Sequence, residues 1–169
     1  TMLFLALLIP APVHAGYNPK YASIVIDAET GRVLRSRNAD KRLHPASLTK
    51  MMTLFLTFEA VENGRLNMNE YVRFSHRAAA QVPSKIGLKA GSRMRVKDAI
   101  LSLVTKSAND VSVVLAEAIA GSEQQFAVMM TQRASALGMK NTTFKNASGL
   151  HHSKQVSTAR DMATLSRAL

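Results

Sequence analysis

The stretch from Ala46 to Val61 constrains the fold most, because it contains neither glycine nor proline and is bounded by helix breakers. Pro45 favours an extended residue before it and a bend just ahead of the helix. Asn63 and Gly64 are residues that commonly follow the end of a helix. The stretch also carries an apolar run, which predicts a helix buried in the core. The run consists of Met51, Met52, Leu54, Phe55 and Leu56.

Ser47 and Lys50 lie at the start of this predicted helix as an S-x-x-K motif, which occurs once in the chain. Positions i and i+3 share a helix face, so Lys50 should lie behind the Ser47 hydroxyl. A lysine acts as a base only when burial and neighbouring positive charge lower its pKa. The apolar run would bury it, and the helix dipole would stabilise negative charge developing at Ser47. The pair therefore predicts an activated serine nucleophile.

Ser107 and Asn109 form a second short motif, S-x-N. S-x-x-K and S-x-N are two of three elements in serine acyl-transfer enzymes that handle penicillin-like substrates. The third, K-T-G, does not occur in the sequence, and we expect it beyond Leu169. Each motif is short enough to arise by chance. The residues alone therefore leave a second interpretation open, in which the serines and Asn109 cap helices and Lys50 is a solvated side chain.

Composition excludes several other kinds of site. The chain has no cysteine, which excludes a disulfide scaffold, a thiolate nucleophile and cysteine metal sites. Its net charge is +11, with 22 Lys and Arg against 11 Asp and Glu, but the basic residues are scattered. We therefore expect no nucleic-acid partner. An anionic wall polymer or phospholipid surface fits at least as well. A serine acyl-transfer enzyme of the kind that the two motifs suggest needs no metal ion or cofactor, so we expect neither.

The first fifteen residues are interpreted as a targeting segment. Met2 to Ile9 is an apolar run, and Val13-His14-Ala15 resembles a cleavage site. We expect residues 1–15 to be the remnant of a secretory signal peptide, although a buried strand or short helix is the alternative. Residues 16–169 would then be one domain, exported across the inner membrane to the periplasm or cell envelope.

The rest of the chain predicts a hairpin followed mostly by helices. Two strands at Ser23–Asp27 and Arg32–Arg37 flank a turn at Ala28–Gly31. Short strand-like pieces occur around Tyr71–Phe74 and Ile86–Leu88, and His76 between them is expected at the surface. Further helices are predicted at Val96–Val104, at Val111–Ala120 in the centre of the core, from Ser122 to Leu137, and from Thr158 onward.

Six collinear stretches resemble the low-molecular-mass penicillin-binding proteins, specifically the serine-type D-alanyl-D-alanine carboxypeptidases. They begin at Tyr21, His44, Lys106, Leu137, Ser148 and Ser157. The resemblance implies an α+β fold of the β-lactamase/transpeptidase type, in which helices pack on a five-stranded antiparallel sheet. We expect the chain to hold only the N-terminal part of this catalytic domain. Strand edges and an apolar sheet face would then be exposed, and the fragment alone would be marginal or inactive.

The resemblance also implies a role for each matched residue. Ser47 would be the acyl-ester nucleophile and Lys50 its general base. Ser107 would relay a proton to the departing D-alanine, and Asn109 would hold the substrate amide and help to fix Lys50. The Ser47 N–H would form half of the oxyanion hole. The implied partners are peptidoglycan stem peptides ending in D-Ala-D-Ala, β-lactam inhibitors, and the inner membrane through peripheral association.

Three alternatives remain at this point. A D-Ala endopeptidase would share every motif. A class A β-lactamase needs a deacylating glutamate, but no E-x-x-L-N occurs, and the only carboxylate after Glu123 is Asp161 at a helix start. A non-catalytic wall-binding module is the third. The sequence assigns no role to His151 and His152, which we expect at the surface.

Overall fold

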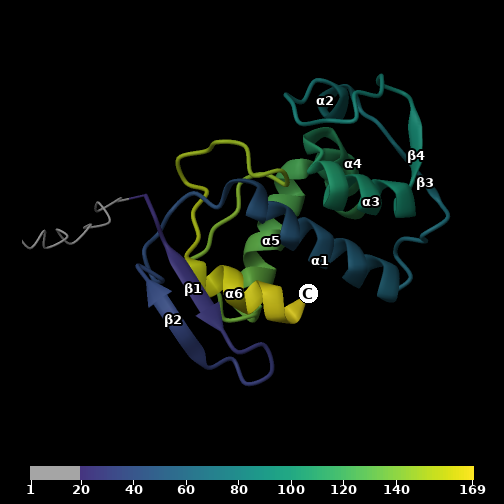
Figure 1. Cartoon of the computed structure of the whole chain (residues 1–169). Coiled ribbons are helices and arrows are strands. Elements are labelled where there is room, and N and C mark those ends of the chain that lie inside the picture. Colours follow the sequence, from purple (N-terminus) through teal and green to yellow (C-terminus); the bar gives the residue numbers. More distant parts are fainter. Residues whose placement is uncertain (1–19) are drawn as a thin grey trace, which may run out of the picture.

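The computed structural model describes residues 20–169, so the predicted signal-peptide remnant lies outside the described residues. The described residues begin with a hairpin and continue mainly as helices (Figure 1), as expected for the α+β class. None of the helices in residues 20–169 has the length and apolar character that a membrane span needs. The elements are β1 Ser23–Ile26, β2 Val33–Arg37, the 3-10 turn η1 Ala46–Leu48, α1 Thr49–Glu62, β3 Tyr71–Arg73, α2 His76–Ala79, β4 Arg93–Arg95, α3 Val96–Lys106, α4 Asn109–Ala120, α5 Glu123–Ala136 and α6 Ala159–Ala168.

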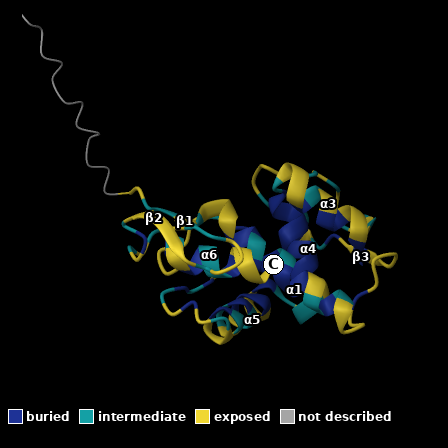
Figure 2. Cartoon of the chain, turned by 60° about the horizontal axis from the view of Figure 1, so that its bottom comes forward, coloured by how far each residue is buried: buried dark blue, intermediate teal, exposed yellow. Residues whose placement is uncertain are grey.

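Helix α4 is the centre of the molecule, as its apolar sequence predicted. It packs against α1, α2, α3 and α5, and its residues 109–116 are all buried. Figure 2 shows the buried residues concentrated along α1 and α4. One cluster, including Met52, Phe126 and Leu165, fills the space between α1, α5 and α6. A second, including Phe74 and Val96, lies between α3, α4 and β3.

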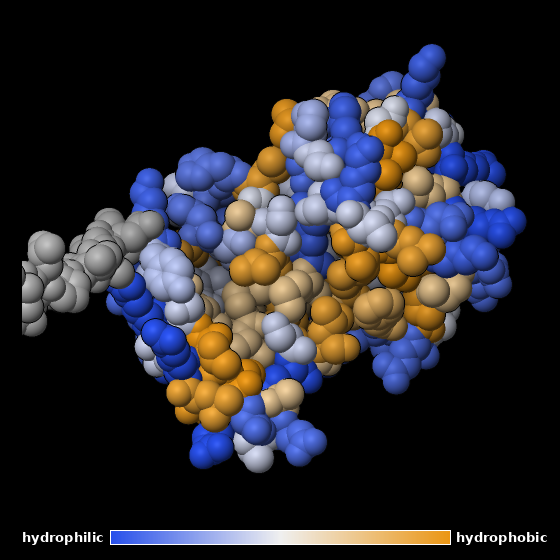
Figure 3. Space-filling model, in the orientation of Figure 1, coloured by the Kyte–Doolittle hydropathy of each residue, from blue (hydrophilic) through white to orange (hydrophobic). Residues whose placement is uncertain are grey.

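The hairpin β1–β2 is antiparallel, and its register shifts after Val25, so that Leu34 is an extra residue on β2. Helix α6 covers β1, but every residue of β2 is exposed. Apolar side chains gather at the hairpin and over α1 and α3 on the face shown in Figure 3. Among the exposed apolar residues of the hairpin are Val25, Val33 and Leu34. These exposed side chains leave apolar surface on the hairpin open to solvent.

The helix boundaries follow local signals closely. Ser122 and Thr158 cap α5 and α6, because their hydroxyls accept hydrogen bonds from the backbone N–H groups of Gln125 and Asp161. Gly121 follows α4 with φ 77°, a left-handed conformation that glycine adopts without strain. The helix starts expected at Ser122 and Thr158 and the helix end expected at Ala120 are confirmed.

The region between α1 and α3 differs from the prediction. The expected strand at Ile86–Leu88 is absent from the structure, and that prediction was wrong. The backbone N–H groups of Ile86 and Gly87 instead donate to the Asp110 carboxylate, so they do not join a ladder. The partner of β3 is β4, with Val72 opposite Met94. The sequence analysis also missed the short helix α2, which Ser75 caps.

Candidate active site

Ser47 lies in the 3-10 turn η1, between Pro45 and helix α1. The preceding residue, Ala46, has φ 48°, a left-handed conformation that costs a non-glycine residue about 1–2 kcal/mol. The sequence predicted that Ser47 opens the helix. In the structure it lies two residues ahead of α1, in the 3-10 turn that leads into the helix, and it is exposed. Strained residues of this kind concentrate at functional sites.

Lys50, on the first turn of α1, points inward and is only 4% exposed. Its Nζ lies 2.8 Å from Asn109 Oδ1, 2.6 Å from the Ser148 carbonyl oxygen and 3.5 Å from Ser47 Oγ. Burial lowers the pKa of Lys50 to about 8, because desolvation disfavours the charged ammonium. Burial is therefore the cause, and not the neighbouring positive charge that we also expected. At neutral pH a fraction of the amine is unprotonated.

Asn109 begins helix α4 and joins Lys50 to the loop before α3. Its Oδ1 accepts from Lys50, while its Nδ2 donates to the carbonyl oxygens of Val82 and Pro83 at 3.0 and 3.2 Å. Its backbone N–H donates to the Ser84 carbonyl oxygen at 2.7 Å. The amide is thus fixed on both sides, which determines the orientation of the oxygen that contacts Lys50.

The neighbouring Asp110 was not singled out by the sequence analysis. It is fully buried, and its carboxylate accepts from the N–H groups of Ile86, Gly87 and Val111 at distances of 2.9–3.1 Å. These hydrogen bonds offset the cost of removing the carboxylate from water. Asp110 therefore anchors the loop that Asn109 also holds.

Ser107 occupies the left-handed position that ends α3, with φ 55°. It is half-buried. Within residues 20–169 no hydrogen bond joins its hydroxyl to Ser47 or Lys50. The structure therefore brings three predicted site residues, Ser47, Lys50 and Asn109, into one hydrogen-bonded cluster. The fourth, Ser107, lies two positions before Asn109 in the chain and makes no hydrogen bond to Ser47 or Lys50 among the described residues.

The loop after α5, residues 145–150, completes the cluster. Lys50 donates to the Ser148 carbonyl oxygen, and Thr53, one turn further along α1, donates to that of Ala147 at 2.7 Å. Gly149 has φ 90°, and a Cβ added there would lie 1.9 Å from the Ala46 carbonyl oxygen. The loop therefore packs directly on the peptide that precedes Ser47, and only glycine fits at that position.

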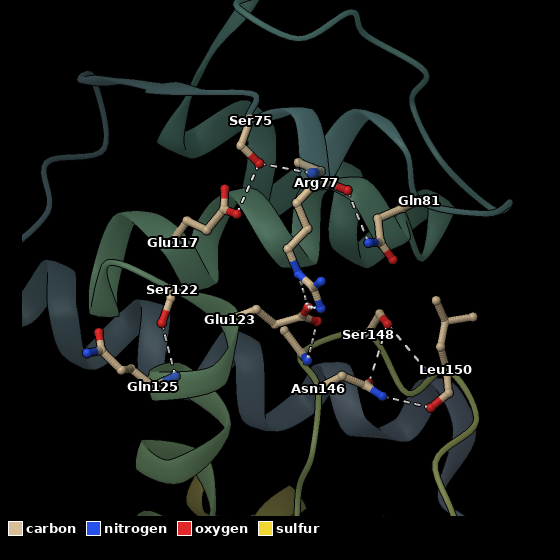
Figure 4. A network of polar contacts seen from close by, with 12 residues as sticks. Ser75, Arg77, Gln81, Glu117, Ser122, Glu123, Gln125, Asn146, Ser148 and Leu150 are labelled. Carbon is tan, nitrogen blue, oxygen red and sulfur yellow. Dashed lines mark hydrogen bonds and ion pairs between the residues drawn. The ribbon is translucent and has the colours of Figure 1, made fainter.

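A further layer of polar contacts holds this loop in place (Figure 4). Glu123 is 3% exposed; it accepts from the Ala147 N–H at 3.1 Å and forms an ion pair with Arg77. The Asn146 side chain accepts from the Gly149 N–H and donates to the Leu150 carbonyl oxygen, both at 2.8 Å. These bonds position the carbonyl groups that receive Lys50 and Thr53.

Sequence reasoning missed the Ser148 carbonyl oxygen, Gly149 and Glu123 as parts of this cluster. A backbone acceptor carries no signal in its residue type. Ser148 and Gly149 belong to one of the resembling stretches, but spacing alone does not reveal their contact with Ala46. Among the described residues no group of three or more histidine, aspartate or glutamate side chains is placed to hold a metal ion.

Known proteins resemble this chain over most of its length. The family model of peptidase S11, described as D-alanyl-D-alanine carboxypeptidase, matches residues 16–169. The D-alanyl-D-alanine carboxypeptidase DacF of Bacillus subtilis is 42% identical over 148 residues, which are 88% of this chain and 38% of that protein. The chain thus spans about two fifths of that curated relative.

Solved structures show the same fold. The crystal structure of the D-alanyl-D-alanine carboxypeptidase DacD from Francisella tularensis matches with a TM-score of 0.85 and 35% identity, covering 98% of this chain and 40% of that one. Penicillin-binding protein D2 from Listeria monocytogenes, in its ampicillin-bound form, matches with a TM-score of 0.72 and 35% identity. That match covers 86% of this chain and 59% of the other.

Proposed function

The chain belongs to the D-alanyl-D-alanine carboxypeptidase family, peptidase S11, and from that premise we propose that its protein is a serine-type carboxypeptidase. The enzyme would remove the terminal D-alanine from peptidoglycan stem peptides through an acyl-enzyme on Ser47. The single observation that carries this proposal is the buried contact of Lys50 with Ser47 and Asn109.

The first step is attack by Ser47 on the carbonyl carbon between the two D-alanines. Lys50 Nζ, 3.5 Å from the hydroxyl, would take its proton. With a pKa of about 8, roughly one tenth of the amine is neutral at pH 7. Asn109 and the Ser148 carbonyl group orient Nζ, because both accept from it. The base is therefore held in place before the substrate arrives.

The next steps involve the oxyanion and the leaving group. No hydrogen bond within residues 20–169 uses the Ser47 N–H, so this group is available for one half of an oxyanion hole. The carbon–nitrogen bond then breaks, and the departing amine of D-alanine needs a proton. We assign that relay to Ser107 and the binding of the substrate amide to Asn109. Water hydrolyses the acyl-enzyme and releases the shortened peptide.

Inhibition by β-lactams is part of the same proposal. A β-lactam presents a strained amide to Ser47, and ring opening leaves the former leaving nitrogen attached to the acyl group. The ampicillin-bound form of the Listeria relative supports this expectation. Substrates of this kind would place the protein in the periplasm or cell envelope, with peripheral membrane association. These assignments rest on the family relationship.

Intact-protein mass spectrometry of the full-length protein, before and after benzylpenicillin, tests the proposal. We expect a persistent adduct of one penicillin mass in the wild type and none in Ser47→Ala. Ser36→Ala, which alters an exposed serine on β2, should keep the adduct. A folded wild-type protein without an adduct would contradict the acyl-enzyme and favour a wall-binding module. Rapid loss of the adduct would favour a β-lactamase.

A further inference from the structure

Two histidines from separate parts of the chain meet beside the Ser47 cluster. His44 precedes the 3-10 turn that carries Ser47, and His151 follows Gly149 in the loop that packs on Ala46. Their ring centroids lie 5.2 Å apart, with the ring planes inclined by 66°. Both residues are exposed. The proposed mechanism uses neither of them.

One of the two rings already has a defined tautomer. His44 Nδ1 lies 2.7 Å from the Gln155 carbonyl oxygen. A carbonyl oxygen only accepts, so Nδ1 must carry the proton, and the Nε2 of the neutral ring keeps its lone pair. Gln155 is buried, and its own side chain accepts from the N–H groups of Lys145 and Asn146. A histidine that donates to a fixed backbone carbonyl is the usual arrangement behind a metal-bound imidazole.

We propose that His44 and His151 form a binding site for a zinc ion. A tetrahedral zinc ion bound by two imidazole nitrogens at about 2.0–2.1 Å holds the two ring centroids about 5 Å apart. The observed distance of 5.2 Å between the ring centroids agrees with this spacing. Among residues 20–169 no third ligand completes a cage, so water would fill the other two positions. Binding should be weak and reversible, as suits an exposed site.

An ion at this place would join the segment before Ser47 to the loop after Gly149. It would strengthen the contact between Gly149 and Ala46 and narrow the approach to the Ser47 hydroxyl. We therefore expect zinc to slow the acylation of Ser47. This consequence rests on the proposed function, whereas zinc binding itself is measured without substrate and stands independently of it.

Calorimetric titration of the untagged, full-length protein with Zn²⁺ tests the site. His151→Ala removes one ligand. His44→Asn removes the other but keeps a donor for the Gln155 carbonyl oxygen. Mutation of a residue that only supports a metal ligand commonly lowers metal affinity about 10–100-fold. Removal of a ligand itself should cost at least as much, so we expect each variant to bind zinc at least about tenfold more weakly. Thermal unfolding without zinc would verify that both are folded.

His152→Ala is the matched control. This neighbour is also exposed, and its Nδ1 accepts from the Lys154 N–H within the loop. Its zinc affinity should equal that of the wild type. Equal affinity in all four proteins, or a loss confined to His152→Ala, would overturn the site. If zinc binds as expected but penicillin acylates the wild type at an unchanged rate, the proposed effect on Ser47 is refuted.

Discussion

Residues 145–150 and the hairpin β1–β2 both join distant parts of the chain, but through different kinds of contact. The loop is held from inside: α1 donates to it through Lys50 and Thr53, and the buried Glu123 accepts from its backbone. At the hairpin, α6 covers β1, and its polar contacts are made by two exposed arginines. Arg160 forms an ion pair with Asp40, and Arg167 donates to the carbonyl oxygens of Ala28 and Glu29.

The difference follows from solvent. Buried polar groups that lose a partner keep the full cost of desolvation, whereas exposed groups exchange a partner for water. The loop carries atoms that orient Lys50, so any disturbance there should reach the chemistry. The hairpin should tolerate change with little effect on the site. Four experiments would test whether the loop and the hairpin differ in this way.

Replacing Lys50 with methionine should have the largest effect. The variant loses the proposed base, and general-base contributions are typically about 10²–10⁴-fold. We expect the rate of penicillin acylation of the full-length protein to fall by that factor, measured by quenched mass spectrometry. Lys97→Met, at an exposed position on α3, should acylate at the wild-type rate. An active Lys50→Met variant would remove Lys50 from the mechanism.

Replacing Gly149 with alanine should disrupt the loop itself. The new Cβ would lie 1.9 Å from the Ala46 carbonyl oxygen, and alanine is strained at φ 90°. Overpacking and strain together should cost about 2–5 kcal/mol of unfolding free energy, measured by denaturant unfolding, and acylation should slow. Gly138→Ala is the control, because it has a similar φ of 83° but open space around it. It should cost about 1–2 kcal/mol and leave acylation intact; equal losses would show that the close contact is unimportant.

The pH dependence of the acylation rate should follow the titration of the buried Lys50 amine. Because burial lowers the pKa of Lys50 to about 8, the acylation rate should rise about tenfold between pH 7 and 9 and then level off. Stability should rise with pH between about 8 and 10.5, because there the unfolded chain binds a proton that the folded protein has released. Stopped-flow acylation with a chromogenic cephalosporin measures the rate. A flat profile over this range would mean that another group is the base.

Replacing Arg160 with alanine should have the smallest effect. Arg160 holds the pKa of Asp40 below its usual value through their hydrogen bonds, but both side chains are largely exposed, at 45% and 64%. We expect the melting temperature to fall by less than about 2 °C, with no change in acylation. Differential scanning calorimetry would detect a larger fall. Such a fall would show that the hairpin depends on α6 as strongly as the loop depends on α1.

Much of the architecture could be predicted because its signals are local. The hairpin turn, the Ser122 and Thr158 caps and the apolar run of α4 act within a few residues of themselves. The strand expected at Ile86–Leu88 failed because a distant carboxylate, Asp110, takes the backbone N–H groups that a ladder would use. The strand propensity of a short segment says nothing about a hydrogen-bond acceptor that the fold brings from elsewhere in the chain.

The spacing of Ser47 and Lys50, and the second motif that contains Ser107 and Asn109, can be read from the sequence alone. The burial of Lys50 between Asn109 and the Ser148 carbonyl oxygen, which lowers its pKa to about 8, appears only in the folded protein. The packing of Gly149 against Ala46 also depends on the tertiary structure. The physical reason is that a helix sets which residues share a face, whereas desolvation and steric contact depend on segments that the fold brings together.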